Sequence, residues 1–539
     1  MLPTNRAQSR VLDIPELLDM IFAFLDETSV ASTASVCKRW SEIALDTLWR
    51  DLADLHRLFG ILRALKQTGD SPDSPYAFTA APDADDWGRL EKYTRRVRRL
   101  TYHYQTPKGP CLCPTVFEDV ARTRTSLNIL PNLKTLVWNA PPPLAVIFMQ
   151  PTVKHFTFWL PETIVQDESH LPFFRDVVSR MPHLTTLDIR TNIPMGTIED
   201  SMIFLFGLTK LRKVILPRFS VTTRIAQALQ HLEDLGCLEF QYCSDQGCGD
   251  PADIESSSPT NLTALYVDSR LIESPAALHE LLTVLADTCQ LLESLGIVTH
   301  VDDTEPLRVL ADVPSEERIN SSTLQPLQNF PNLTIFEITH QYPLDLKLAD
   351  LERLARSWPS LRKLMLNNEP VVSDECSLTL EALIPFAKHC PELEQLGLFV
   401  NASTAELPLK VDLSPSPQFK KLRRLSMGVS RISDPGPVAL FLSQICPLNI
   451  YLESGITWEI EGQREQQQQP PLLQTISNRC GMWAKVEELL PLLTKLRMEE
   501  RERSRLLVAE VQDLRMRCGV LTDKLAAIGG RSGESCVTL

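Results

Sequence analysis

Residues 389–401 read HCPELEQLGLFVN, and this stretch decides the fold because its spacing recurs along most of the chain. Leu393 is followed after three positions by Leu396 and after two more by Leu398. An L-x-L step fits a short strand whose alternate side chains enter a core. The preceding residues, 377–390, have the apolar pattern of a helix. The stretch therefore predicts one strand–helix unit of an α/β fold.

The same apolar spacing predicts eleven further strands between residues 94 and 453, with anchors 20 to 41 residues apart. Each unit leaves an apolar face that only the next unit can cover, so we expect parallel strands and helices stacked as a solenoid. A second clear helix is expected at residues 274–289. The other copies are Val97-Leu100-Tyr102, Leu133-Leu136-Trp138, Val153-Phe156-Phe158, Leu184-Leu187-Ile189, Leu211-Val214-Leu216, Leu235-Leu238-Phe240, Leu262-Leu265-Val267, Leu292-Leu295-Ile297, Leu333-Phe336-Ile338, Leu361-Leu364-Leu366 and Leu422-Leu425-Met427.

HCPELEQLGLFVN and FPNLTIFEITH (330–340) resemble the degenerate leucine-rich repeats that follow F-boxes. The Asn or Cys usual after the strand is present only at Asn192, Cys243 and Asn401. The resemblance implies an irregular leucine-rich-repeat array over residues 94–453.

Residues 10–56 differ from the repeats and predict a small helical module. Pro15 suits the first turn of a helix, and Leu17, Leu18, Ile21, Phe24 and Leu25 follow at helical spacing. A later helix has its apolar face at Val36, Cys37, Trp40, Ile43 and Ala44. So much apolar side chain on so short a unit suggests that part of it covers a partner.

This module resembles an F-box, with Ile-Pro in place of the usual opening Leu-Pro. The resemblance implies three helices that dock onto the Skp adaptor of a cullin-based ubiquitin ligase. The alternative is a helical cap that only shields the first repeat. The residues that the resemblance assigns to adaptor binding or its support are Ile14, Pro15, Leu17, Leu18, Ile21, Leu25, Val36, Cys37, Trp40, Leu48 and Trp49.

Three stretches are expected to be connections. Residues 57–93 are a linker or helical connector, because 71–87 are rich in proline and aspartate. Residues 301–322 form a long loop that leaves the array. Residues 460–478 are a polar linker.

Residues 480–529 predict a long amphipathic helix that ends at Gly529-Gly530. Its seam has heptad spacing over about three repeats, weakens at Arg497, Glu500 and Ser504, and is interrupted by Pro491. The seam favours either a coiled coil that makes a homodimer or a helix folded back on the array. Its residues are Leu507, Val511, Leu514, Cys518, Leu521, Leu525 and Ile528.

The sequence contains no local catalytic motif and no paired metal-ligand spacing, which predicts a non-catalytic protein without cofactor or metal. Its 54 Lys+Arg against 68 Asp+Glu give a formal charge of −14, which argues against nucleic acid as a partner. The basic run 93–99 is interpreted as an ion-paired strand face. We expect no membrane contact, free thiols, and a cytoplasmic or nuclear location.

The resemblance to F-boxes and to the repeats that follow them implies a substrate-recognition subunit of an Skp–cullin–F-box ubiquitin ligase, active in protein degradation. The F-box would bind the adaptor, and the array would bind a target protein. Residues 111–479 contain 29 Lys+Arg and 44 Asp+Glu, which favours a target with a basic surface. The alternative is a repeat scaffold outside any ligase, organised by a C-terminal coiled coil.

Overall fold

The computed structural model describes residues 14–69, 74–104, 111–161, 170–191, 193, 195–217, 225, 228–229, 231–241, 261–269, 274–299, 318–370, 376–403, 417–456 and 471–529. The chain divides into two compact units, one of residues 1–271 with 280–298 and one of residues 272–279 with 299–539. The expected loop at 301–322 lies mostly outside the described residues, as do Asn192 and Cys243.

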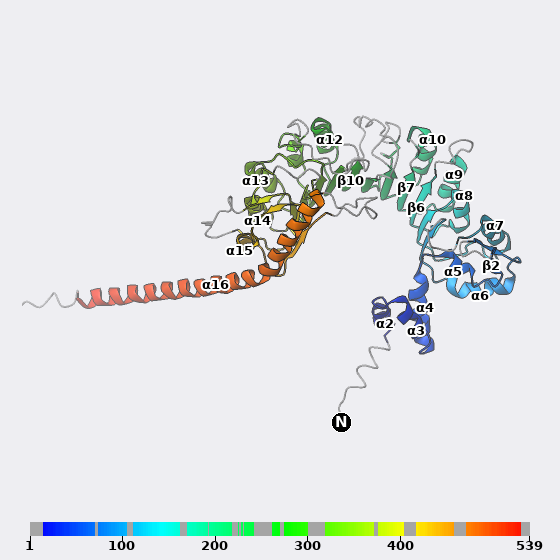
Figure 1. Ribbon diagram of the computed structural model, residues 1–539, viewed down its shortest axis with the longest axis horizontal. Coiled ribbons are helices and arrows are strands. Elements are labelled where there is room, and N and C mark those ends of the chain that lie inside the picture. Colours follow the sequence, from blue (N-terminus) through cyan, green and yellow to red (C-terminus); the bar gives the residue numbers. More distant parts are fainter. Residues whose placement is uncertain are drawn as a thin grey trace, which may run out of the picture. The chain divides into compact units, whose positions relative to one another are not determined.

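The first unit begins with three short helices, α2 (Pro15–Phe22), α3 (Glu27–Thr33) and α4 (Lys38–Arg50), labelled in Figure 1. Pro15 occupies the first helical turn, as its sequence position predicts. The helices enclose a core of Leu18, Phe22, Val30 and Ala44. The N-terminal part of the chain is thus a three-helix module, as expected.

A parallel sheet follows the module in the order β1, β4, β5, β6, β7, β8, β9, β10 and β11. The register aligns Leu100 with Leu136, and Leu136 with Phe156, so the repeat positions stack. The bounds are β1 (Asp51–Leu52), β4 (Arg99–His103), β5 (Thr135–Asn139), β6 (His155–Leu160), β7 (Thr186–Thr191), β8 (Lys213–Pro217), β9 (Cys237–Gln241), β10 (Ala264–Ser269) and β11 (Ser294–Thr299).

Helices and a hairpin connect these strands. Figure 1 shows α7, α8, α9 and α10 lying along one side of the sheet. The helical residues that lie against the sheet are apolar and buried, such as Val116 and Phe174. The elements are α5 (Leu55–Phe59), β2 (Leu65–Gln67), β3 (Tyr76–Phe78), α6 (Ala84–Thr94), α7 (Pro114–Thr123), α8 (Pro142–Ala145), η1 (Val146–Phe148), α9 (Leu171–Arg180), α10 (Met195–Leu205) and α12 (Pro275–Thr288).

The described part of residues 57–93 contains the end of α5, the β2–β3 hairpin and α6, so of the two expected forms it has that of a folded helical connector and not of an extended linker. The strand β1 directly follows α4 and pairs with β4. Asp83 caps α6 through a capping box with Asp86, and this helix buries Trp87 and Leu90. Two of the aspartates that suggested a loop, Asp83 and Asp86, are therefore helix-capping residues.

The second unit repeats the arrangement with strands in the order β12, β13, β14, β16 and β18. Leu364 lies level with Phe336 and Leu396, which continues the stacked core. The elements are η4 (Gln325–Asn329), β12 (Ile335–Thr339), α13 (Leu348–Ser357), β13 (Lys363–Leu366), η5 (Leu380–Leu383), α14 (Ile384–His389), β14 (Gln395–Leu398), β15 (Asn401–Ala402), β16 (Arg424–Gly428), β17 (Arg431–Ile432), α15 (Pro435–Ile445) and β18 (Tyr451–Ser454).

All twelve expected repeat strands are confirmed, from β4 to β16, and their inward residues are buried. The expected helices at 274–289 and 377–390 are also present, the second as η5 followed by α14. The fold is therefore a helical module followed by a leucine-rich-repeat-like array of parallel strands. No helix in the described residues has the length and apolar character needed to cross a membrane.

The last described residues form one long helix, α16 (Pro471–Gly529), which changes direction along its length in Figure 1. It starts inside the stretch expected to be a linker, because Pro471 is compatible with a first helical turn. Pro491 lies within the helix and does not interrupt it. Val486, Leu490 and Thr494 are buried on either side of the proline. Their packing keeps the helix continuous although Pro491 has no backbone N–H to donate a helical hydrogen bond.

A candidate protein-docking surface on the N-terminal helices

Helix α2 presents apolar side chains both to its own core and to solvent. Leu18 and Phe22 are fully buried, one turn apart. Ile14 just before the helix, Ile21 in its last turn and Leu25 in the connection to α3 are about two-fifths exposed. A helix that only covered its own core would expose polar residues there. These positions on and around α2 are therefore available for another protein.

Three further apolar residues of the module are exposed. Met20 is 60% exposed, Phe24 is 88% exposed, and Val36, in the turn before α4, is 61% exposed. Exposed apolar residues gathered on one small module typify protein-binding sites. We call the following residues the α2 surface: Ile14, Met20, Ile21, Phe24, Leu25 and Val36.

The residues expected to bind the adaptor fall into three groups by exposure. Leu18 and Trp49 are buried, and Leu17, Trp40 and Leu48 are partly buried. The buried members can shape the module but cannot touch a partner in this conformation. Contact with a partner remains a prediction for the exposed members, which are Ile14, Pro15, Ile21, Leu25, Val36 and Cys37.

The sequence did not predict the exposed positions of two residues of the α2 surface or the buried position of one core residue of the module. Met20 and Phe24 were not assigned to binding, and Phe22 was not assigned to the core. Phe24 was expected on the helix face with Leu17, but α2 ends at Phe22 and Phe24 lies in the turn that follows. The F-box resemblance locates the module, but the depth of each side chain depends on how the helices pack.

Local contacts hold the shape of the module. Trp40 packs edge-on against Phe22, with ring centroids 5.7 Å apart. The side chain of Asp26 caps α3 and accepts from the Ser29 backbone N–H at 3.2 Å. Hydrogen bonds from the Ser29 and Thr28 hydroxyls lower the pKa of Asp26 to about 2. The Sγ atom of Cys37 accepts from the Trp40 backbone N–H at 3.5 Å. The exposed Cys37 thus has a local structural contact as a cap of α4.

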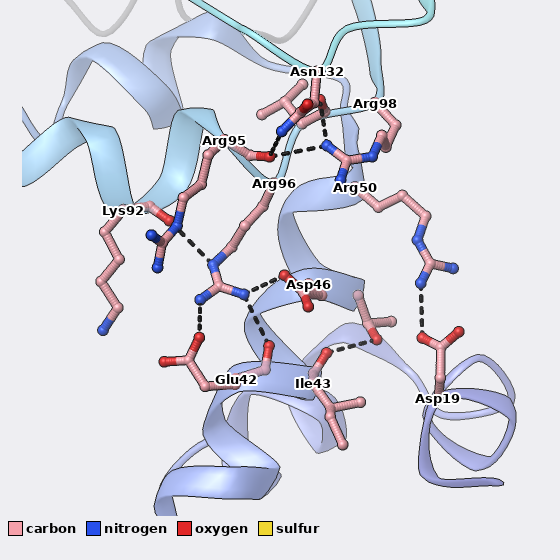
Figure 2. Close-up of polar contacts among 12 residues, drawn as sticks. Asp19, Glu42, Ile43, Asp46, Arg50, Lys92, Arg95, Arg96, Arg98 and Asn132 are labelled. Atoms are coloured by element: carbon pink, nitrogen blue, oxygen red, sulfur yellow. Dashed lines mark hydrogen bonds and ion pairs between the residues drawn. The ribbon is translucent and has the colours of Figure 1, made fainter. Parts of the chain in front are cut away.

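Arg96 joins the three-helix module to the first repeat. Figure 2 shows its guanidinium between Glu42 and Asp46 of α4, with which it forms ion pairs. It also donates to the Glu42 carbonyl oxygen at 3.0 Å and to the Lys92 carbonyl oxygen at 3.1 Å. Its side chain is 4% exposed. Arg96 of the basic run 93–99 is thus ion-paired. Its partners lie on α4, a helix of the module, and not on the strand face that the sequence suggested.

Electrostatics favour the charged forms at this junction. Burial opposes the charge of Arg96, but the hydrogen bonds that Arg96 donates to Glu42 and Asp46 outweigh it and raise the pKa of the guanidinium. The hydrogen bond from Arg96 lowers the pKa of the Glu42 carboxyl below its ordinary value. Both groups are therefore charged at neutral pH, and the module is held to the array by opposite charges.

Further contacts close the same junction. Trp49 packs against Tyr93 of α6, with ring centroids 4.8 Å apart, and Arg57 lies over the Trp49 ring at 4.8 Å. The Arg98 backbone N–H donates to the Arg50 carbonyl oxygen at 2.8 Å, which continues the β1–β4 pairing. Trp49 thus packs against α6 on the side of the repeats, and its support of adaptor binding stays a prediction.

The repeats contain no gathered group of metal ligands among the residues that the structure describes. The described cysteines carry free thiols. Burial raises the pKa of Cys390 and of Cys446 to about 12, so these thiols are protonated and unreactive at neutral pH. Their positions at helix ends before strands make them core residues.

Comparison with known proteins identifies the module. The F-box-like family model matches residues 15–54, so these residues form an F-box-like domain. A search of curated proteins finds no match to this chain. The structure is similar to an internalin (inlF) from Listeria monocytogenes, with 15% identity and a TM-score of 0.35, over 77% of this chain and 97% of that chain. It is also similar to a chain of the Rad7 and Elc1 complex in yeast, with 14% identity and a TM-score of 0.32, over 79% and 96%.

Proposed function

We propose that this protein is the substrate-recognition subunit of an Skp–cullin–F-box ubiquitin ligase. The observation that carries the proposal is the exposed apolar α2 surface on a module that matches the F-box-like family. In this proposal an Skp-type adaptor covers the α2 surface, and the repeat array binds the target. The chain itself performs no chemistry, and it works in the cytoplasm or nucleus, where ligase cores are found.

The mechanism is positional. Binding of a target to the array raises its effective concentration near the ubiquitin-charged enzyme. The Arg96 junction supports this role, because it fixes the F-box-like domain to the first repeats instead of leaving a flexible hinge. A rigid connection is useful where two reacting groups must be held at one separation.

The target proposed is a protein with a basic surface. The support is the charge of residues 111–479, which carry 44 Asp+Glu against 29 Lys+Arg. Attraction of this kind acts through exposed charges and weakens as salt screens them. We expect capture of the target by the full chain to fall between low and high salt. Capture that ignores salt would contradict a basic target surface.

Paired substitutions on the α2 surface test the adaptor proposal. The full chain with Ile21→Asp and Phe24→Asp is expected to bind a purified Skp-type adaptor about a hundredfold more weakly, because each charge would be buried against an apolar partner. The measurement is a titration followed by calorimetry. Circular dichroism is expected to be unchanged, because both side chains are exposed in the free chain.

Leu127→Asp is the matched control. Leu127 is 70% exposed and lies outside the module, so this equal change of polarity is expected to leave adaptor affinity unaltered. Wild-type affinity in the Ile21/Phe24 variant would contradict docking through the α2 surface. Trp40 is a poorer probe, because it packs on Phe22 and its loss would disturb the core.

A second candidate function is a repeat scaffold that acts outside any ligase. The exposed C-terminal part of α16 favours it, because a long helix with a free apolar seam can organise partners, a second copy of this chain among them. Absence of adaptor binding by the unaltered chain, together with self-association through α16, would favour the scaffold over the ligase receptor.

A further inference from the structure

Helix α16 has two halves with different surroundings. In the first half, buried side chains recur at helical spacing and pack on α15 and β18 of the second unit. The Trp483 indole N–H donates to the Ser430 carbonyl oxygen at 3.0 Å, and Arg479 donates to the Val429 carbonyl oxygen at 3.0 Å. The buried residues of this half are Ile476, Trp483, Val486, Leu490 and Thr494.

The second half of α16 carries apolar residues that nothing described covers. From residue 498 to residue 526 every side chain is exposed except that of Asp513, which is partly exposed. The apolar seam residues are between 45% and 70% exposed. Cys518, also in the seam, is exposed, and the Ile528 side chain lies outside the described residues. The exposed apolar seam residues are Leu507, Val511, Leu514, Leu521 and Leu525.

One heptad frame runs through both halves. Trp483, Val486 and Leu490 occupy the same core positions of the frame as the later seam residues. The frame continues through Leu493, and the next three core positions, Arg497, Glu500 and Ser504, are polar. The same apolar face of α16 is therefore buried against the array in the first half of the helix and exposed in the second half. The polar interval occurs where the helix leaves the array, since Arg501 donates to the Gln444 carbonyl oxygen of α15 at 2.9 Å.

We infer that the second half of α16 pairs with the same segment of a second copy of this chain, as a parallel two-stranded coiled coil in register. The seam has Val511 and Cys518 at alternate core positions, with Leu514 and Leu521 between them. A β-branched residue at the first core position with leucine at the second favours two parallel strands, and Val511 with Leu514 has this pattern, while Cys518 and Leu525 hold the later first positions. The inference does not rest on the adaptor proposal, because it uses no residue of the F-box-like domain.

The charges beside the seam select the orientation. In a parallel pair in register, the residue just before the first core position of a heptad faces, on the partner helix, the residue five positions later in the sequence. Glu510 then faces Arg515 of the other copy, and symmetry makes this contact twice. The flanking positions at 503 and 508, and at 517 and 522, pair arginine with an uncharged residue, so no like charges meet.

An antiparallel pair over the same seam has worse electrostatics. In that orientation the middle of the segment meets itself, so Arg515 faces Arg515 and Arg517 faces Arg517 of the other copy. Glu510 then faces Lys524, so the antiparallel pair has as many attractions as the parallel pair and two repulsions in addition. Like charges at facing positions destabilise a coiled coil and change its partner choice. The charges beside the seam therefore favour the parallel dimer over the antiparallel one. Such a dimer would place two F-box-like domains and two arrays in one particle.

Sedimentation of the full chain tests the dimer. We expect a mass twice that of the 60.8 kDa chain at high micromolar concentration. The variant with Leu514→Glu and Leu521→Glu is expected to sediment as a monomer at the same concentration, because four charges would meet in the seam. The unaltered chain sedimenting as a monomer would overturn the inference.

A matched variant controls for the change in surface polarity. Leu506→Glu with Val520→Glu makes the same substitution at residues that are equally exposed but lie off the seam, so the dimer is expected to persist. Dissociation of this control to the same extent as the seam variant would contradict pairing through the seam.

A charge exchange tests the orientation. Glu510→Arg is expected to weaken the dimer about tenfold, because two attractions become two repulsions. Adding Arg515→Glu to that chain is expected to restore the wild-type dissociation constant. An antiparallel pair would gain nothing from the second change, since residue 515 would still face its own copy. Failure of the rescue would therefore overturn the parallel register.

Discussion

A chain carrying Trp483→Ala is expected to lose about 4 kcal/mol from the unfolding free energy of its second unit. Trp483 is 1% exposed, and its indole N–H donates to the Ser430 carbonyl oxygen at 3.0 Å. Truncation leaves a cavity between α16 and the last repeats and removes one partner of a buried carbonyl. Denaturant unfolding of the full chain, with circular dichroism as the signal, measures the loss as a shift in the midpoint of that unit's transition.

The same helix supplies a control for this substitution. Leu492 is 61% exposed, so Leu492→Ala is expected to change the free energy by less than about 0.5 kcal/mol. Trp483→Phe is expected to fall between the two, because it keeps most of the ring and loses the hydrogen bond. Equal stability of the alanine variants at 483 and 492 would show that the first half of α16 does not stabilise the array.

The repeat strands were predictable because their physical signal is local. An inward residue at every second position is enough to mark a strand, and the buried Leu396 and Leu398 of β14 show that pattern. β1 escaped prediction because only two residues pair, and its single inward residue, Leu52, has no alternating neighbour. A strand at the end of an array pairs with only one neighbouring strand, so fewer of its residues need to follow the alternating apolar pattern of the repeat.

Composition misled the interpretation of the segment between module and array. Proline and aspartate favour loops, but aspartate also caps helices, and Asp83 does so for α6. The buried Trp87 and Leu90 that follow were the contrary signal. At α16, Pro471 likewise stands at a helix start. The same residue types mark a linker or a helix end, and only the packing of the next turn distinguishes them.

The candidate site was predictable as a module and not as a surface. The order of apolar residues in 14–49 resembles an F-box, and the F-box-like model matches 15–54. Which of those residues face outward depends on where α2 ends, and that end separates the buried Phe22 from the exposed Phe24. The partners of Arg96 lie about fifty residues away in the chain, too far apart for any local pattern to pair them.

Replacing Arg96 by methionine is expected to destabilise the junction between the F-box-like domain and the first repeat by about 2 kcal/mol. Methionine keeps the length of the stem but removes the ion pairs to Glu42 and Asp46 and the donor to the Glu42 carbonyl oxygen. Both carboxylates are more than half exposed and can return to water, so the loss is smaller than for a fully buried pair. Denaturant unfolding of the full chain measures this loss as a shift in the midpoint of the first unit's transition.

The pH dependence of this loss distinguishes an ion pair from simple packing. Arg96 lowers the pKa of Glu42 in the folded chain, so the stability it adds is complete above the pKa of an unfolded glutamate. That contribution disappears as the pH falls through the lowered pKa. The difference between wild type and Arg96→Met is therefore expected to narrow in acid. A difference independent of pH would mean that Arg96 acts only by packing.

Arg98→Met is the matched control, since Arg98 is exposed and donates to the nearby Arg95 carbonyl oxygen at 2.9 Å. It removes the same charge from the same run and is expected to change stability by less than about 0.5 kcal/mol. Adaptor affinity should be unchanged in both variants, because neither residue belongs to the α2 surface. Under the proposed receptor function, ubiquitin transfer to a bound target should fall only with Arg96→Met, because only that change loosens the connection between the F-box-like domain and the first repeats.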